Sequence, residues 1–236
     1  MRRHLTILLV LIFGVALISG LQGVVTLPVT DNFPSTGTEL SWEDYDSAYN
    51  VIESFSPTAP GGDGYVLNVN DGSGWQVVHL TDDDGSLGDY TITAYIYVPT
   101  SDGTNWGRVG VYARAQGTHY TTFRNSYMLI ADSDADDCLR VVRYYDNGAG
   151  WDIYFQGNIT RSAWHKFELS LMGSEIIGRI DDVEVYSDSV ATDFTTGYIG
   201  IMCFQQTTSA PVTYCDRITI TPNIPTKVSG SWSLYE

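Results

Sequence analysis

Cysteine and histidine are scarce in this sequence, and neither residue type is clustered. Among 236 residues there are three cysteines and four histidines, with no Cys-x-x-Cys pair or His-rich stretch that would indicate a zinc site. Cys203 and Cys215 flank a polar loop, and in an exported chain they are candidates to form a disulfide across two neighbouring strands. Cys138 would then be the odd cysteine, available to bridge to another chain.

Positive charge is also scarce. The chain has 12 Lys and Arg residues against 28 Asp and Glu residues, which gives a formal net charge of −16. Because phosphate binding requires positive charge, this balance argues against a nucleic-acid partner. An acidic surface suits solubility, divalent cations or high salt, and it is also what an ordinary solvated surface provides.

A hydrophobic run occurs at the N-terminus. Arg2 and Arg3 are followed by a mostly apolar stretch, residues 5–18, which has the layout of a secretory signal. The run is short for a membrane span, which needs roughly 20 apolar residues. We therefore expect residues 1–23 to be a signal peptide and the protein to be secreted, extracellular or at the cell surface. Membrane association would follow only if this segment were retained as an anchor.

Helical periodicity is nearly absent, and period-two alternation takes its place. Residues 90–98 are rich in β-branched and aromatic side chains and end before Pro99, as expected of a strand. Similar runs are separated by turn sequences such as 71–74 and 146–148. About a dozen short strands at this spacing predict an all-β fold. We expect a two-sheet antiparallel β-sandwich over residues 24–222, because each sheet must bury one apolar face.

The last residues, 223–236, have a different character. Their Pro, Ser and Gly content predicts an extended C-terminal tail. The tail nevertheless carries Trp232 and Tyr235, which could dock on another surface. Together with the odd Cys138, such a tail leaves self-assembly open. The protein would then be a structural subunit of a surface layer or extracellular filament, in which the segment adds a strand to a neighbour's sheet.

The order of several short motifs resembles a known superfamily. These motifs are Asp31-Asn32-Phe33, 65–69 after a Gly-rich turn, 107–114, 164–169, the 180–182 hairpin, 197–201 and 214–220. Over roughly residues 31–221 they resemble the concanavalin A-like lectin/glucanase superfamily, particularly its laminin G-like and 3-keto-disaccharide hydrolase-like branches. The resemblance implies a jelly roll of two antiparallel sheets, one of them concave, with the N- and C-terminal strands side by side.

Motifs for catalysis are missing. Glycoside hydrolysis normally needs two carboxylates that flank the bond, and the glucanases of the resembled superfamily carry Glu-x-Asp-x-Glu, which this chain lacks. In the nearest stretch, the three-residue spacing of Glu43 and Asp46 places them on opposite faces of a strand. No His-Glu-x-x-His or Gly-x-Ser-x-Gly motif is present either. We therefore expect a non-catalytic protein, with a divergent glycoside hydrolase or polysaccharide lyase as the alternative.

Acidic residues suggest calcium in two places. Asp132, Asp134 and Asp136 alternate along one loop, as carboxylates do in calcium-binding loops, although a polar turn would use the same residues. The resemblance implies a second site, because similar carbohydrate-binding sandwiches share a structural calcium between acidic residues near the first strand and in the last. Asp31 and Asp216 match those positions. The expected cofactor is therefore a structural Ca²⁺.

Aromatic residues provide the candidate binding surface. The chain has 16 Tyr and 6 Trp residues, and such rings can stack on sugar faces while keeping a polar group. Strand packing would use the same residues, because tyrosine is also a favoured strand residue. The candidates for a carbohydrate-binding face are Trp106, Tyr112, Arg114, Tyr120, Tyr127 and Trp151. The sequence thus predicts a secreted, calcium-stabilised, lectin-like protein whose partner is a glycan or polysaccharide.

Overall fold

The computed structural model describes most of the chain between Leu27 and Asn223. The described residues are 27–34, 42–44, 50–69, 74–80, 85–100, 107–117, 124–132, 138–205 and 213–223. The predicted signal peptide, 1–23, and residues 224–236 of the predicted tail lie outside them. Within the described ranges the secondary structure consists of strands and one short 3₁₀ turn. No helix in those ranges is long and apolar enough to cross a membrane.

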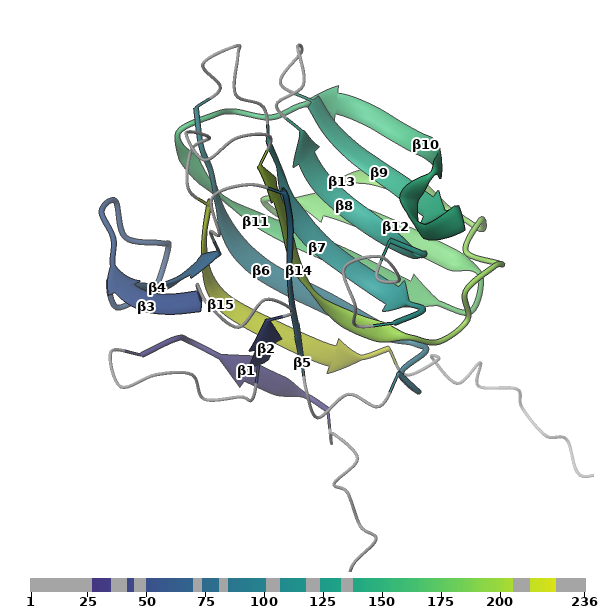
Figure 1. Ribbon diagram of the computed structural model, residues 1–236, viewed down its shortest axis with the longest axis horizontal. Coiled ribbons are helices and arrows are strands. Elements are labelled where there is room, and N and C mark those ends of the chain that lie inside the picture. The colour runs from purple at the N-terminus through teal and green to yellow at the C-terminus, as the bar shows by residue number, and fades with distance from the viewer. Residues whose placement is uncertain are drawn as a thin grey trace, which may run out of the picture.

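Sheet A is the larger of two antiparallel sheets (Figure 1). Its strands are β1 (Val29–Asp31), β3 (Asn50–Ser54), β4 (Tyr65–Val69), β6 (Tyr90–Val98), β11 (Ala163–Met172), β12 (Glu175–Ile180), β13 (Val183–Asp188) and β15 (Thr213–Pro222). Their order in the sheet is β13-β12-β11-β6-β15-β4-β3, and β1 also pairs with β15.

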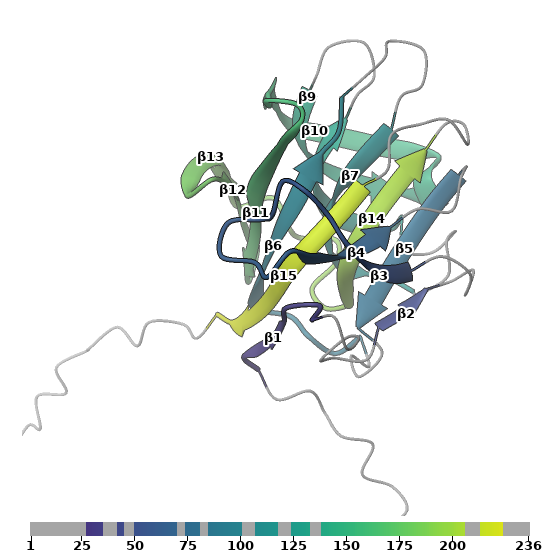
Figure 2. The same ribbon diagram turned by 90° about the vertical axis from the view of Figure 1, so that its left-hand side faces the viewer.

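Sheet B packs face to face with sheet A (Figure 2). Its strands are β2 (Trp42–Asp44), β5 (Gly74–Leu80), β7 (Gly107–Ala115), β8 (Ser126–Asp132), β9 (Cys138–Tyr145), β10 (Gly150–Asn158) and β14 (Tyr198–Gln205), and the 3₁₀ turn η1 (Asp146–Gly148) joins β9 to β10. Their order is β10-β9-β8-β7-β14-β5-β2. The predicted all-β, two-sheet antiparallel sandwich is therefore confirmed.

The main core fills the space between the sheets. In β6, fully buried residues alternate with half-buried ones, and Ile92, Ala94 and Ile96 face inward. Val111 and Leu129 contribute to the same cluster from sheet B. Such alternation buries one apolar face of each sheet against the other, which is what holds a sandwich together.

Sheet B is unusual because its outer face is buried as well. A second apolar cluster lies there, and its residues are no more than 3% exposed: Val77, Tyr112, Ala115, Met128, Ile130, Val142, Tyr144 and Met202. Strand β8 is buried at every position. The centre of this face is therefore closed to solvent, so accessible side chains must lie at its margin, where β10 is an edge strand.

The first and last strands lie side by side, as the resemblance implies. Val29 on β1 pairs with Ile220 on β15. The pairing of β15 with β6 shifts register between Asp216 and Thr219, and Arg217 within this shift has a φ of +54°. A bulge of this kind re-aims the local side chains, and Asp216 is only 1% exposed here.

Candidate functional site

Trp151 is the exposed tryptophan of the described chain, at 37% relative exposure. It lies on the edge strand β10 and pairs with Tyr144 on β9. The two ring centroids are 5.6 Å apart, with an interplanar angle of 32°. Since directly paired residues share a face and Tyr144 belongs to the outer cluster, Trp151 lies on the outer face of sheet B. It presents an aromatic surface at the margin of that face.

Two arginines support the indole ring of Trp151. The guanidinium carbons of Arg108 and Arg140 each lie 5.3 Å from the ring centroid. Their side chains are only 12% and 10% exposed. Cations over an aromatic ring are attracted by its quadrupole, and the attraction grows when the cation is desolvated. The ring is therefore held in place by contacts with Tyr144, Arg108 and Arg140.

A buried carboxylate fixes both arginines. Asp132 is fully buried, and its Oδ2 accepts hydrogen bonds from Arg108 Nε at 2.8 Å and from Arg140 Nη1. Arg108 Nη1 also donates to the Tyr144 hydroxyl at 3.1 Å. Burial raises the pKa of Tyr144, so this hydroxyl stays neutral near pH 7. We call these five residues, including Trp151, the Trp151 cluster.

The cluster is suited to binding rather than to proton transfer. An aromatic side chain that is already held in one orientation loses little conformational freedom when a ligand stacks on it. The Asp132 carboxylate is buried and already accepts from two guanidinium groups, so it is not placed to exchange a proton with a ligand at the surface. The chemistry available at the surface is the flat, partly exposed indole of Trp151.

The structure also bears on the predicted calcium loop. Asp132 is the member of that loop that is described, while Asp134 and Asp136 lie outside the described residues. Because two positive groups already contact Asp132, a divalent cation at its carboxylate would be repelled by both. The Asp132 carboxylate instead supports the two arginines that contact Trp151, which corrects its predicted role.

Three other predicted binding residues are buried, so their expected exposure is wrong. Tyr112 belongs to the outer cluster of sheet B, and Tyr127 faces the core between the sheets. The Tyr127 hydroxyl accepts hydrogen bonds from the backbone N–H groups of Asp193 and Phe194 at 3.2 and 3.4 Å. Burial also raises the pKa of Tyr127. These contacts make Tyr127 a structural residue.

Arg114 is the third buried candidate, and it anchors loops. Its guanidinium donates to the carbonyl oxygens of Gly88 and Gly173 at 2.9 Å and of Phe194 at 3.0 Å. Burial lowers its pKa, an effect that Tyr90 and Asp89 partly oppose. The side chain thus satisfies carbonyl groups from three separate connections and offers nothing to a ligand. The remaining candidates, Trp106 and Tyr120, lie outside the described residues.

Asp31 and Asp216 form the second location of interest, where β1 runs beside β15. Asp31 is fully buried, and its carboxylate accepts hydrogen bonds from the Phe33 N–H and the Trp42 Nε1–H, both at 2.8 Å. Neither carboxylate oxygen of Asp216 has a hydrogen-bond partner, although the residue is only 1% exposed. A buried carboxylate without a partner is costly, and a cation beside it would offset that cost.

The surroundings of Asp216 are acidic and tightly packed. Burial raises the pKa of Asp216 to about 6, Asp63 and Asp31 act in the same direction, and Arg217 opposes them. A Cβ added at Gly62 would lie 2.1 Å from Oδ2 of Asp216, so the turn can approach only with glycine there. No group of three or more His, Cys, Asp or Glu side chains in the described ranges is arranged to hold a metal. A cation here would need main-chain oxygens or water in addition to carboxylates.

The predicted disulfide is not formed. All three cysteines are buried, and no disulfide joins Cys203 to Cys215. Cys203 lies on β14 of sheet B and Cys215 on β15 of sheet A, so the chain crosses from one sheet to the other between them. Cys203 Sγ lies 3.5 Å from Thr213 Oγ1, and burial raises the pKa of Cys215 well above its usual range. The prediction that Cys203 and Cys215 lie on neighbouring strands is therefore wrong.

Comparison with known proteins places the fold. No protein-family model and no curated protein matches the sequence. Among solved structures, the carbohydrate binding module CBM66 from Bacillus subtilis is similar, with a TM-score of 0.54 and 13% identity over 78% of this chain and 97% of that one. The carbohydrate recognition domain of Emp47p has a TM-score of 0.59 and 10% identity over 84% and 95%.

An enzyme shares the architecture too. A glycoside hydrolase family 16 endo-glucanase from Bacteroides ovatus has a TM-score of 0.57 and 13% identity over 81% of this chain and 99% of that one. At these identities the likeness concerns the fold. Proteins described as carbohydrate binding modules, recognition domains and hydrolases thus have similar structures. The chain has the concanavalin A-like jelly-roll fold that the resemblance implies.

Proposed function

We propose that this chain is a non-catalytic carbohydrate-binding protein, and that Trp151 is the platform on which a sugar ring stacks. The observation that carries the proposal is the exposed indole of Trp151 at the margin of sheet B, which the guanidinium groups of Arg108 and Arg140 contact. Apolar faces of sugar rings pack on such a surface, while their hydroxyl groups remain in water. The shared fold of a carbohydrate binding module and a recognition domain supports this assignment.

The chemistry of the cluster favours binding over hydrolysis. Glycoside hydrolysis normally uses a pair of carboxyl groups, of which one serves as acid and the other as base or nucleophile. Asp132 is the carboxylate of the Trp151 cluster, and its ion pairs with Arg108 and Arg140 disfavour either role. This supports the non-catalytic assignment despite the fold shared with an endo-glucanase.

We also propose a structural Ca²⁺ at Asp216 and Asp31. The unsatisfied carboxylate of Asp216 supports it, because a hard divalent cation prefers oxygen ligands and would neutralise the buried charge. Such an ion would join the first and last strands of sheet A. The proposed place of action is outside the cytoplasm, which rests on the signal-like residues 1–23.

Binding to polysaccharides by the Trp151→Ala variant tests the assignment. Soluble β-glucan, fructan, mannan and pectin would each be titrated into the full chain by calorimetry in the presence of Ca²⁺. For any glycan bound by the natural protein, removal of the indole should raise Kd by about tenfold or more, equivalent to about 1.4 kcal/mol.

Tyr65 provides a matched control for this experiment. It is also 37% exposed, but it lies on β4 of sheet A. Tyr65→Ala should therefore leave the Kd within about twofold of the natural value. Equal binding by the natural protein and Trp151→Ala would contradict the proposed platform, and release of reducing sugar from any of the glycans would contradict the non-catalytic assignment.

A further inference from the structure

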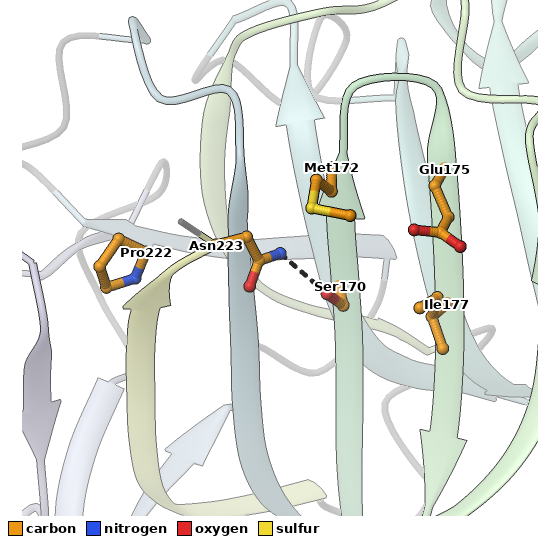
Figure 3. A pocket seen from close by; sticks show the side chains of 6 residues that line it. All are labelled: Ser170, Met172, Glu175, Ile177, Pro222 and Asn223. Atoms are coloured by element: carbon orange, nitrogen blue, oxygen red, sulfur yellow. Dashed lines mark hydrogen bonds between the residues drawn. The ribbon is translucent and has the colours of Figure 1, made fainter. Parts of the chain in front are cut away.

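A pocket of about 420 Å³ opens on the outer face of sheet A, away from the Trp151 cluster. Its lining comes from β11, β12 and the end of β15, and the residues are Ser170, Met172, Glu175, Ile177, Pro222 and Asn223. Figure 3 shows the side chains of β11 and β12 on one side and Pro222 with Asn223 on the other. The pocket is therefore bounded by the last described residues of the chain.

Asn223 is fixed to the sheet at this pocket. Its Nδ2 donates to Ser170 Oγ at 2.8 Å and to the Leu171 carbonyl at 2.9 Å, and its Oδ1 accepts from Thr91 Oγ1 at 2.8 Å. The backbone N–H also donates to the Asp89 carbonyl at 3.0 Å. Since β6 lies between β15 and β11, these bonds draw the side chain across one strand toward the pocket. The chain thus leaves β15 from a fixed position on the pocket rim.

The lining defines the chemistry of an occupant. Met172 is 39% exposed, and with Ile177 it offers an apolar surface to solvent. Glu175 is the charged member of the lining residues. An occupant should therefore combine an apolar side chain with a positive charge.

We propose that this pocket is the docking site for the chain's own C-terminal segment, residues 224–227. Ile224 directly follows Asn223, and Lys227 comes three residues later. Four extended residues reach at most about 14 Å, so the docked contacts all lie close to Asn223. In the docked state Ile224 contacts Met172 and Ile177, and Lys227 pairs with Glu175. Lys227 and Lys166 are the two lysines of the chain, so few side-chain amines compete for a cross-link to Glu175.

The covalent connection favours this occupant over a separate molecule. A tethered segment experiences an effective concentration in the millimolar range, so weak apolar and ionic contacts are enough to populate the docked state. A second copy of the chain would have to reach that concentration by itself. The proposal concerns the outer face of sheet A and is independent of glycan binding at Trp151.

Zero-length cross-linking of the full chain tests the docking directly. A carbodiimide joins a lysine amine to a carboxylate in contact with it, and mass spectrometry identifies the partner. We expect Lys227 to be joined to Glu175 within the monomer. A Glu175–Lys227 link found only in dimers, or a Lys227 linked mainly to other carboxylates or to none, would overturn the proposal.

Trypsin cleavage after Lys227 gives a second measurement. Docking protects this bond, so Glu175→Gln should raise the native-state cleavage rate about threefold or more and abolish the cross-link. Glu184→Gln is the matched control, because Glu184 is exposed on β13 and pairs with Arg179 instead. Equal cleavage rates for Glu175→Gln and the natural protein would count against docking, and circular dichroism would confirm that both variants are folded.

Discussion

Charged and aromatic side chains divide into those that the fold uses and those that it leaves to a ligand. Arg114 donates to three loop carbonyls and Asp132 accepts from two arginines, so both are satisfied within the protein. Trp151 follows a turn on an edge strand and is 37% exposed. A ligand at this margin therefore meets the indole and not the buried charges.

Asp216 carries a pH prediction. Its pKa is about 6 in the fold and about 3.9 in an unfolded chain, so the folded state binds the proton more tightly. Without calcium, this group should therefore reduce stability as the pH rises from about 4 to 6, by roughly 2–3 kcal/mol in total. In EDTA at pH 7, Asp216→Asn should be more stable than the natural protein by a similar amount, measured by urea unfolding, and the difference should vanish near pH 4.

The response of Tm to Ca²⁺ in the same variant tests the proposed cation site. Ca²⁺ should raise the Tm of the natural protein by mass action and leave that of Asp216→Asn unchanged. Asp188→Asn changes an exposed carboxyl on β13 and serves as the control, which should respond to Ca²⁺ as the natural protein does. An Asp216→Asn protein that is less stable in EDTA at pH 7, or that gains the same Tm from Ca²⁺, would refute the proposed cation site.

For the secondary-structure elements, local sequence patterns were enough to predict strands and turns. They did not predict which side chains from distant strands contact one another. The run 90–98 is β6 as predicted. The contact of Arg108 with Asp132 depends on the register in which β7 pairs with β8. The sequence of neither strand specifies that register. The available sequence signal was that Arg108 and Arg140 lie on strands that can flank the acidic residue Asp132. That signal was not used to predict their contact.

The β12–β13 hairpin is an element that the sequence specifies locally. Asp181 and Asp182 were expected in this turn, and they have φ values of +50° and +67°. Left-handed backbone suits Asn and Asp but penalises β-branched side chains. Asp182→Val should therefore lower the free energy of unfolding by about 1–2 kcal/mol, whereas Asp182→Asn should be nearly neutral.

Urea unfolding followed by circular dichroism checks this pair of variants. Asp182 also pairs with Lys166 at 2.6 Å, but the Asp182 side chain is 76% exposed, so loss of that ion pair should have little effect. Because both substitutions remove the charge, the difference between them isolates the backbone cost. Equal stabilities for the two variants would show that the turn does not impose this conformation.

At the scale of the whole molecule, period-two alternation was enough to predict two stacked antiparallel sheets. It was not enough to predict that sheet B is buried on its outer face. Apolar residues such as Val77, Met128 and Met202 do not indicate in the sequence whether the face that carries them is covered. Among the residues with a described side chain, that burial leaves Trp151 as the exposed aromatic residue on this side, at the sheet margin. Fold and candidate site are connected in this way, because the site lies where the covered face ends.

Nuclear magnetic resonance of the six tryptophan indole N–H groups, recorded during titration with a bound glycan, reports directly whether the sugar contacts Trp151. We expect the Trp151 resonance, assigned from its absence in Trp151→Phe, to shift most and to saturate with the calorimetric Kd. The half-buried Trp164 on the outer face of sheet A should stay unchanged. Saturable shifts confined to other tryptophans, with Trp151 unmoved, would rule out Trp151 as the binding platform.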